Sequence, residues 1–220
     1  MTPTTLLFDL DGTLTDNYAG IAASIVHALG RLDRPAPDAA ALRACVGPPL
    51  RGSFARFLGT TEPALIERAI AHYRERYAEV GWRENVAYDG AGEALAALHA
   101  RGARMFLCTS KPTVFATRIV RHFGFDAYLH GVYGADLDGA LDDKATLLSH
   151  LVAIERIDPR TATMIGDRAN DIRAAHANRV RAVGALWGYG SREELAEAEA
   201  LVETPSLLVT LLIDQATAPS

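Results

Sequence analysis

Near its start the chain reads Leu6-Leu7-Phe8-Asp9-Leu10-Asp11-Gly12-Thr13-Leu14-Thr15-Asp16. The apolar residues at the front of this stretch predict a short buried strand. Side chains two positions apart on a strand face the same way, so Asp9 and Asp11 can converge beyond its carboxyl end, where Gly12 allows a turn. Neighbouring carboxylates repel each other and are costly to desolvate, which a divalent cation with oxygen ligands would offset. An acidic turn after an edge strand is the alternative, but the whole pattern is more specific than an isolated pair of aspartates.

The composition is typical of a globular protein with a sizeable core. The 220 residues are 49% hydrophobic and 22% charged, and the length allows one large domain or two small ones. A net charge of -5 disfavours nucleic-acid binding. No apolar run approaches the roughly 20 residues of a membrane span, and the start has no signal-peptide pattern. Two cysteines indicate neither a disulfide framework nor a metal cluster. We therefore expect a cytoplasmic protein that binds neither nucleic acid nor membranes.

The chain has two different patterns of hydrophobicity. Residues 16–86 have helical spacing almost throughout, whereas helices and strands alternate from Tyr88 onward. Such alternation predicts a parallel sheet with right-handed crossovers, which binds ligands beyond the carboxyl ends of its strands. An insertion of about 70 residues is too long for a loop. We expect an α/β fold, in which residues 1–15 and 87–220 form a Rossmann-like parallel sheet with helices on both faces, and residues 16–86 form an inserted α-helical cap domain.

Polar residues follow the predicted strand 104–108 and open the predicted helix 142–156. Thr109 and Ser110 supply hydroxyl and backbone N–H groups at an expected helix start, which is a natural phosphate site. Lys144, near the start of the predicted helix 142–156, can bind a phosphate. Taken singly, an ordinary helix cap and a solvated lysine are the plainer interpretations.

Two more aspartates follow the predicted strand 161–165. Asp167 comes directly after Gly166, and Asp171 lies one helical turn later on the same helix face. They could complement the helix dipole, but their place after a strand fits metal ligation better. Because all these groups would open at one edge of one sheet, we expect a single site. Arg51, in the predicted cap, either binds a substrate carboxylate or second phosphate bidentately or is a solvated surface residue.

These groups together can perform phosphoryl transfer. A carboxylate can attack phosphorus and form an aspartyl-phosphate, and Mg2+ and a lysine offset the charge that would otherwise repel this nucleophile. A second carboxylate can give a proton to the leaving oxygen and then activate the hydrolytic water. We therefore expect Mg2+ as the cofactor and a small phosphorylated metabolite as the substrate.

Four motifs lie in a recognisable order along the whole chain. They are Asp9-Leu10-Asp11-Gly12-Thr13-Leu14-Thr15-Asp16, Cys108-Thr109-Ser110-Lys111-Pro112, Asp143-Lys144 and Ile165-Gly166-Asp167-Arg168-Ala169-Asn170-Asp171. With them the sequence resembles the haloacid dehalogenase superfamily of phosphatases, and within it the phosphoglycolate phosphatase-like group. The stretches Val46-Gly47-Pro48-Pro49-Leu50 and Trp187-Gly188-Tyr189-Gly190 also look like this group.

The resemblance implies the roles of the four aspartates. Asp9 would be the nucleophile and Asp11 the general acid/base. Mg2+ would bind the Asp9 carboxylate, the Asp11 backbone carbonyl and the Asp167 carboxylate, with Asp171 supporting the metal site. Because dehalogenation in this family does not use the second aspartate, Asp11 argues for a phosphatase.

The resemblance also implies which groups hold the substrate. Thr109 and Lys144 would bind the phosphoryl oxygens, with backbone N–H contacts from Gly12 and Ser110.

Two other functions remain open at this point. A phosphosugar mutase on the same scaffold would return the phosphoryl group to a sugar, so it would form a sugar-phosphate isomer rather than free phosphate. A non-catalytic, phosphorylatable binding module would bind phosphate or metal without turnover. Phosphoglycolate, a nucleotide and a sugar phosphate are all plausible substrates, and both a monomer and a homodimer are compatible with the sequence.

Overall fold

The computed structural model describes residues 4–137 and 141–217, and the chain divides into two compact units. The first unit takes in residues 1–15 and 87–220, and the second takes in residues 16–86. Short strands β2 (Thr15–Asp16) and β3 (Val86–Ala87) lie where the chain passes from one unit to the other, and they form a two-stranded sheet.

The first unit is built on a six-stranded sheet with the order β5-β4-β1-β6-β7-β8. Its central strand β1 is buried along its whole length and pairs in parallel with β4 on one side and β6 on the other. The remaining strand pairs are parallel as well, which confirms the expected parallel sheet. The strands span β1 (Thr5–Phe8), β4 (Arg104–Pro112), β5 (Gly131–Ala135), β6 (Ala162–Gly166), β7 (Arg181–Ala185) and β8 (Ala200–Val202).

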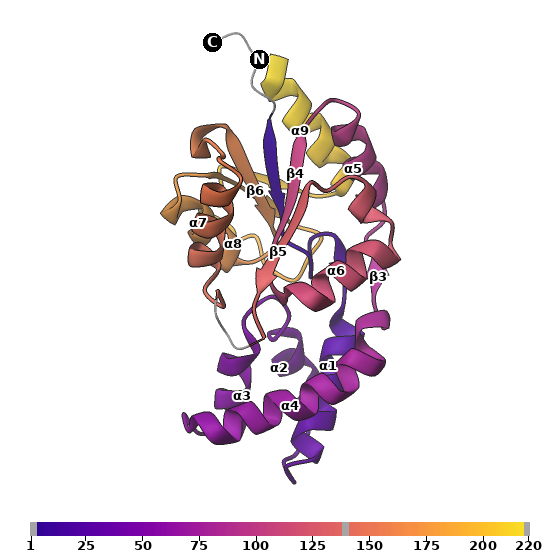
Figure 1. The fold of residues 1–220 in the computed structure, drawn as a ribbon, viewed down its shortest axis with the longest axis vertical. Coiled ribbons are helices and arrows are strands. Elements are labelled where there is room, and N and C mark those ends of the chain that lie inside the picture. The colour runs from indigo at the N-terminus through magenta and orange to yellow at the C-terminus, as the bar shows by residue number, and fades with distance from the viewer. Residues whose placement is uncertain (1–3, 138–140, 218–220) are drawn as a thin grey trace. The chain divides into compact units, whose positions relative to one another are not determined.

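Helices cover both faces of this sheet, as expected. Helices α5, α6 and α9 lie on one face, and α7 and α8 lie on the other (Figure 1). The two faces follow from right-handed crossovers, because the chain steps outward from β1 to β5 and then returns through β6 to β7. The bounds are α5 (Ala91–His99), α6 (Thr113–His122), η2 (Phe125–Ala127), α7 (Lys144–Ile154), η3 (Pro159–Thr161), α8 (Ala169–Ala177) and α9 (Pro205–Thr217).

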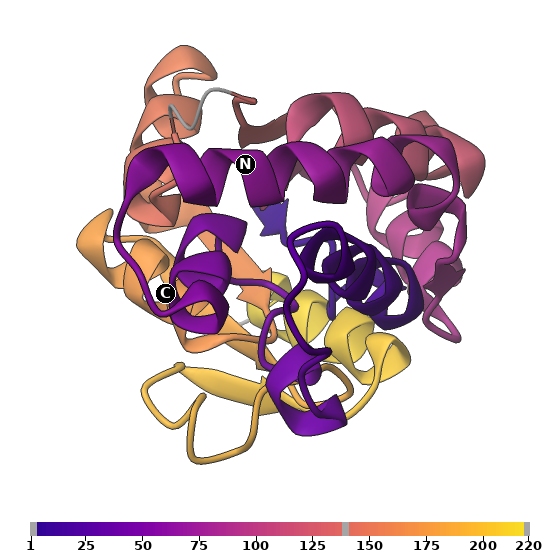
Figure 2. The ribbon, with the colours of Figure 1, turned by 90° about the horizontal axis from the view of Figure 1, so that it is seen from below.

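The second unit is helical. It contains α1 (Tyr18–Gly30), α2 (Ala39–Arg43), α3 (Leu50–Leu58), α4 (Pro63–Glu79) and η1 (Gly81–Arg83). The long helix α4 passes beside both α1 and α3 (Figure 2). Its buried face carries Ile66, Ile70, Tyr73 and Tyr77, as their helical spacing predicts. In the part of the chain that the structure describes, no helix is both long and apolar enough to cross a membrane.

The end of β4 differs from the expected helix start. Because β4 runs to Pro112, Thr109 and Ser110 lie in a strand, and α6 begins only at Thr113. Pairing of Thr109 with Gly134 of β5 holds this segment extended, and the residue before a proline is disfavoured in a helix.

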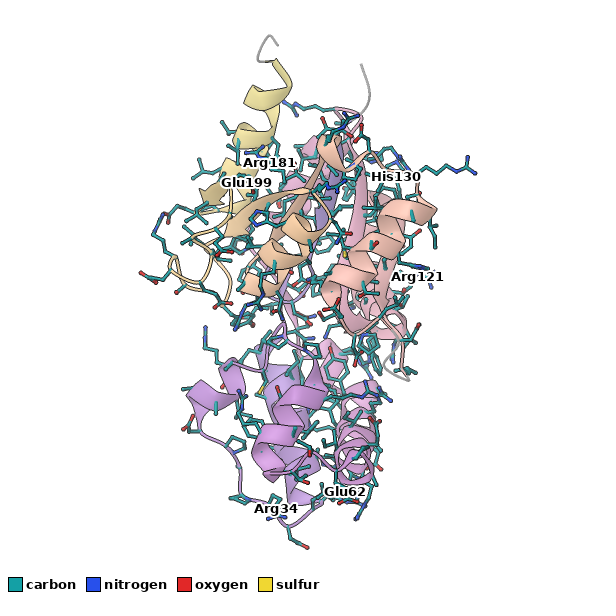
Figure 3. The ribbon with its side chains drawn as sticks, turned by 90° about the vertical axis from the view of Figure 1, so that its left-hand side faces the viewer. Arg34, Glu62, Arg121, His130, Arg181 and Glu199 are labelled. Atoms are coloured by element: carbon teal, nitrogen blue, oxygen red, sulfur yellow. The ribbon has the colours of Figure 1, made fainter. Side chains whose placement is uncertain are left out.

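The alternation of helices and strands predicts a further helix over residues 193–199, but this prediction is wrong, because the segment consists of turns and bends. Its end is held at β7, where the Glu199 N–H donates to the Ala182 carbonyl oxygen (3.1 Å) and the Ala182 N–H donates to Glu199 Oε2 (2.8 Å). In Figure 3 the labelled Glu199 lies next to Arg181, the residue that precedes Ala182. Tertiary contacts with a strand therefore override the local helical pattern.

Candidate active site

The carboxylate of Asp9 lies directly beyond the central strand. The Asp9 N–H donates to the Ile165 carbonyl oxygen (2.9 Å), so the chain stays attached to β6 one residue past β1. Asp9 Oδ1 is 2.7 Å from Nζ of Lys144, the first residue of α7. The same ammonium contacts Oδ1 of Asp171 on α8. A single buried lysine thus joins two carboxylates that come from different elements.

Asp167, at the end of β6, completes a group of three buried acids. Its Oδ1 accepts from Thr13 Oγ1 (3.2 Å) and its Oδ2 accepts from the Tyr189 N–H (2.8 Å). One carboxylate oxygen from each of Asp9, Asp167 and Asp171 can be chosen so that all three lie within 4.8 Å of one another. The positions of these three residues after predicted strands lead us to expect this convergence.

The charges in this group are not balanced by the lysine. Burial raises the pKa of Asp167 well above its usual range, and the nearby Asp171 and Asp9 carboxylates raise it further. Burial also raises the pKa of Asp171, although Lys144 acts in the opposite direction. Burial would lower the pKa of Lys144, but the Asp171 and Asp9 carboxylates outweigh it and raise the pKa. A hard divalent cation such as Mg2+ fits this cluster, because it prefers oxygen ligands and would supply the missing positive charge.

Glycines give the acids the space that they occupy. Gly12 has φ +93°, and a Cβ atom there would lie 2.1 Å from Asp167 Oδ2. At Gly166 a Cβ atom would lie 2.2 Å from Cγ of Asp171. Both positions therefore need a residue without a side chain, and at Gly12 the left-handed backbone adds a second reason.

Asp11 has a different partner from Asp9. Its Oδ2 is 2.7 Å from Nζ of Lys111 on β4, and both side chains are buried. The Lys111 N–H donates to Oγ1 of Thr109 (3.3 Å), two residues earlier on the same strand. Thr109 is buried and Ser110 is half-buried. Phe8 pairs with Leu107, so Thr109 lies on the neighbouring strand just beyond the level of Asp9.

Arg51 belongs to the helical unit. It lies on α3, and its Nε donates to Oε1 of Glu67 on α4 (2.8 Å). Its expected role toward the substrate stays a prediction.

Both cysteines are buried free thiols, as expected of core residues. Burial raises the pKa of Cys108 to about 12, so its thiol is a poor nucleophile at neutral pH.

The structure adds neighbours for which the sequence predicts no role. Lys111 belongs to the motif Cys108-Thr109-Ser110-Lys111-Pro112. It lies two residues after Thr109, so a predicted strand continued beyond residue 108 would have placed both side chains on the same strand face. Trp187 Nε1 donates to the Thr13 carbonyl oxygen (2.9 Å), so the aromatic stretch packs on the turn after β1. Glu194 contacts the start of α8, and no local pattern marked it.

Known proteins match this chain along most of its length. The sequence profile described as haloacid dehalogenase-like hydrolase matches residues 6–185. A 5'-nucleotidase from Pseudomonas aeruginosa is 44% identical over 190 residues, which cover 86% of this chain and 86% of that protein. Tyrosine-protein kinase PtkA from Mycobacterium tuberculosis is 38% identical over 202 residues, covering 92% of this chain and 68% of that protein. A phosphoglycolate phosphatase from Pseudomonas putida is 30% identical over 214 residues, covering 94% and 76%.

A solved structure agrees with the fold over almost the entire chain. The crystal structure of a predicted phosphatase from Clostridium acetobutylicum has a TM-score of 0.92 and 34% sequence identity, and the match covers 97% of this chain and 100% of that one. These likenesses confirm both the family resemblance and the Rossmann-like fold. The chain therefore belongs to the haloacid dehalogenase-like hydrolases.

Proposed function

We propose that this chain is a phosphatase that hydrolyses a small phosphomonoester through an aspartyl-phosphate formed on Asp9. The observation that carries the proposal is the convergence of three buried carboxylates and one buried ammonium at the carboxyl ends of β1 and β6. Membership of a hydrolase family supports the same conclusion. Asp9, Asp167 and the Asp11 backbone carbonyl would hold Mg2+, and Asp171 would support them.

The first step forms the phosphoenzyme. An Asp9 carboxylate oxygen attacks phosphorus, the bond from phosphorus to the ester oxygen breaks, and that oxygen leaves with the electron pair. Asp11 donates a proton to the leaving oxygen. Lys144 and Thr109, with the N–H group of Ser110, bind the phosphoryl oxygens. The expected contact from Gly12 is not made, because the Gly12 N–H donates to the Thr15 carbonyl oxygen (2.8 Å). Mg2+, when bound, offsets negative charge on the phosphoryl group and on the attacking carboxylate.

The second step returns the enzyme to its starting state. A water oxygen attacks phosphorus, the bond from phosphorus to the Asp9 oxygen breaks, and the electron pair returns to the carboxylate. Asp11, now unprotonated, accepts a proton from this water. Lys111 Nζ lies 2.7 Å from Asp11 Oδ2 and holds this side chain in place for the two proton transfers.

The names of the relatives support a ranking of substrate classes. We place nucleoside 5'-monophosphates first, because the Pseudomonas aeruginosa relative is named a 5'-nucleotidase, and phosphoglycolate and sugar phosphates next. The helical unit would act as the cap, with Arg51 as the residue that reads the non-transferring part of the substrate. A turnover screen of about a hundred metabolite phosphates, repeated with Arg51→Ala, tests both ideas, since loss of Arg51 should raise KM selectively for the preferred substrate.

Asp9→Asn tests the nucleophile. We expect it to abolish turnover of p-nitrophenyl phosphate and to leave the circular dichroism spectrum unchanged, since an amide is a poor nucleophile of the same shape. The matched control is Asp126→Asn, because Asp126 is exposed on η2 in the same unit. Retained turnover in Asp9→Asn would rule out the aspartyl-phosphate on this residue.

The acceptor of the phosphoryl group separates this proposal from its rivals. Hydrolysis in 18O-labelled water should place one labelled oxygen in free phosphate. A sugar-phosphate isomer without free phosphate would instead indicate a mutase, and binding without turnover would indicate a binding module. One relative is named a tyrosine-protein kinase, so transfer of a labelled phosphoryl group to a tyrosine-containing peptide is measured in parallel.

A further inference from the structure

The segment 187–194 lies against the acids of the site. Trp187 Nε1 donates to the Thr13 carbonyl oxygen (2.9 Å), in the turn that follows β1. Two residues later the Tyr189 N–H donates to Asp167 Oδ2 (2.8 Å). The segment therefore contacts Asp167 directly and also the turn whose Thr13 hydroxyl binds the other oxygen of the same carboxylate.

The backbone of this segment packs closely against Asp167 at two glycines. A Cβ atom at Gly188 would lie 2.4 Å from Cβ of Asp167 and 2.3 Å from the Gly12 carbonyl oxygen. At Gly190 a Cβ atom would lie 2.0 Å from the Asp167 carbonyl oxygen. Displacement of the segment would therefore displace Asp167 or open a gap beside it.

Glu194 ties the far end of this segment to α8. Its Oε1 accepts from Arg168 Nε (2.9 Å) and from the N–H of Ala169, the first residue of the helix (2.9 Å). An N–H at a helix start has no partner within the helix, so the carboxylate satisfies it and complements the helix dipole. The preceding Arg168 N–H donates to Asp171 Oδ2 (2.9 Å). Glu194 thus binds the residues that position Asp171, while its own segment binds Asp167.

We propose that Glu194 is a positioning residue, which anchors the segment 187–194 to the start of α8 and thereby orients the Asp167 and Asp171 carboxylates for a divalent cation. Groups that orient metal ligands typically change metal affinity or activity by about 10- to 100-fold when they are removed. This inference rests on the proposed function, because it assumes that the acids bind Mg2+.

The experiment measures Mg2+ binding directly, by isothermal titration calorimetry on the full chain without substrate. Glu194→Ala should raise the Kd for Mg2+ by about 10- to 100-fold. Glu194→Gln should recover most of the affinity, because its amide oxygen can accept the same two hydrogen bonds. Glu197→Ala is the matched control, since Glu197 is exposed three residues further on, and its Kd should equal that of the wild type. Thermal unfolding without Mg2+ is recorded for every variant.

The possible outcomes are distinguishable. If Glu194→Ala binds Mg2+ with a Kd within twofold of the wild type, the inference is wrong while the proposed function stands. The same conclusion holds if the variant lowers only the unfolding temperature, because Glu194 would then stabilise the fold without orienting the acids. If the wild type itself binds no Mg2+, the metal role in the proposed function fails and the inference fails with it.

Discussion

Single residues in this site are held by groups from distant parts of the chain. Lys144 joins Asp9 and Asp171, and Gly12 leaves room for Asp167. Breaking a buried ion pair by removing one partner typically costs about 3–5 kcal/mol, because the other charge stays buried. Small changes at these positions should therefore have large effects on activity. This can be tested at Gly12, for which the chain offers a matched control glycine.

Gly12→Ala should abolish most of the activity. The added methyl group would overlap the Asp167 carboxylate, and a displacement of about 1 Å in a catalytic group can cost on the order of 100-fold in rate. The control is Gly124→Ala, because Gly124 also has a positive φ (+71°) but has no atom within 4 Å of an added Cβ. Both variants should lose roughly 1–2 kcal/mol of stability to backbone strain, as measured by urea unfolding. Equal kcat/KM values for the two variants would contradict the proposed clash.

At the scale of elements, strand ends and helix starts bring the groups of the candidate site together. The carboxyl ends of β1, β4 and β6 carry acids or hydroxyl groups, and α7 begins at its lysine. Asp143 caps α7, because its Oδ1 accepts from the Thr146 N–H (2.8 Å). In the helical unit, Asp38 caps α2 in the same way through the Ala41 N–H (2.8 Å).

Asp143→Ala should weaken both the helix and the site. Loss of a cap costs about 1 kcal/mol, and fraying of the first turn would move Lys144 away from the phosphoryl position. We expect kcat/KM to fall by roughly tenfold. Asp38→Ala loses an equivalent cap in the other unit, so it should lower stability by a similar amount with kcat/KM unchanged. A parallel loss of activity in both variants would show that the effect is not specific to α7.

The helical unit carries a pH-dependent contact of its own. Arg76 on α4 donates two hydrogen bonds to Glu84 (2.8 Å each), and this bond lowers the pKa of Glu84 from its usual 4.5. Because the folded-state pKa is lowered, the contact stabilises the protein above pH 4.5, and the contribution is lost as the pH falls through the lowered pKa. Glu84→Gln should therefore lower the free energy of unfolding by about 0.5–1 kcal/mol at pH 7 and by almost nothing near pH 3.

The control for this contact is Glu203→Gln. Glu203 also pairs with an arginine, Arg192, but both side chains are mostly exposed (64% and 60%), so removal of this charge should leave stability unchanged at both pH values. If Glu84→Gln lowers the free energy of unfolding near pH 3 as much as at pH 7, packing and not the ion pair is responsible.

At the scale of the molecule, a bound cation should stabilise the whole first unit, because its proposed ligands follow strands that are far apart in the sequence. Asp9 precedes the helical insertion and Asp167 follows it. Cation binding by the folded state alone therefore favours the assembled sheet over the unfolded chain.

Addition of Mg2+ should raise the unfolding temperature of the wild type. At a concentration of 100 times the Kd, binding adds about 2.7 kcal/mol, which corresponds to a rise of roughly 5–10 °C for a chain of this length. Asp167→Asn should remove most of this rise, while Asp126→Asn should keep it, with ionic strength matched by NaCl in differential scanning calorimetry. An equal rise in Asp167→Asn would exclude Asp167 as a ligand.

Local patterns in the sequence were sufficient for the fold class and for the acids of the site. Buried apolar runs followed by Asp9, Asp11 and Asp167 predict strand ends, and parallel strands bring their carboxyl ends to one edge. Local patterns were insufficient at the end of β4 and at residues 193–199, where contacts with β5 and β7 override the local preference for helix. Glu194 carries no local signal because its partners, Arg168 and Ala169, lie on another element.

The sequence by itself determined most of the order of helices and strands, the parallel sheet and the acids at its edge, because these depend on hydrophobic spacing and turn residues within short windows. Only the tertiary structure decided that Lys144 joins two carboxylates, that Lys111 pairs with Asp11 and that Trp187 reaches Thr13, 174 positions away. Such contacts depend on how separate elements pack, so no spacing along the chain could specify them.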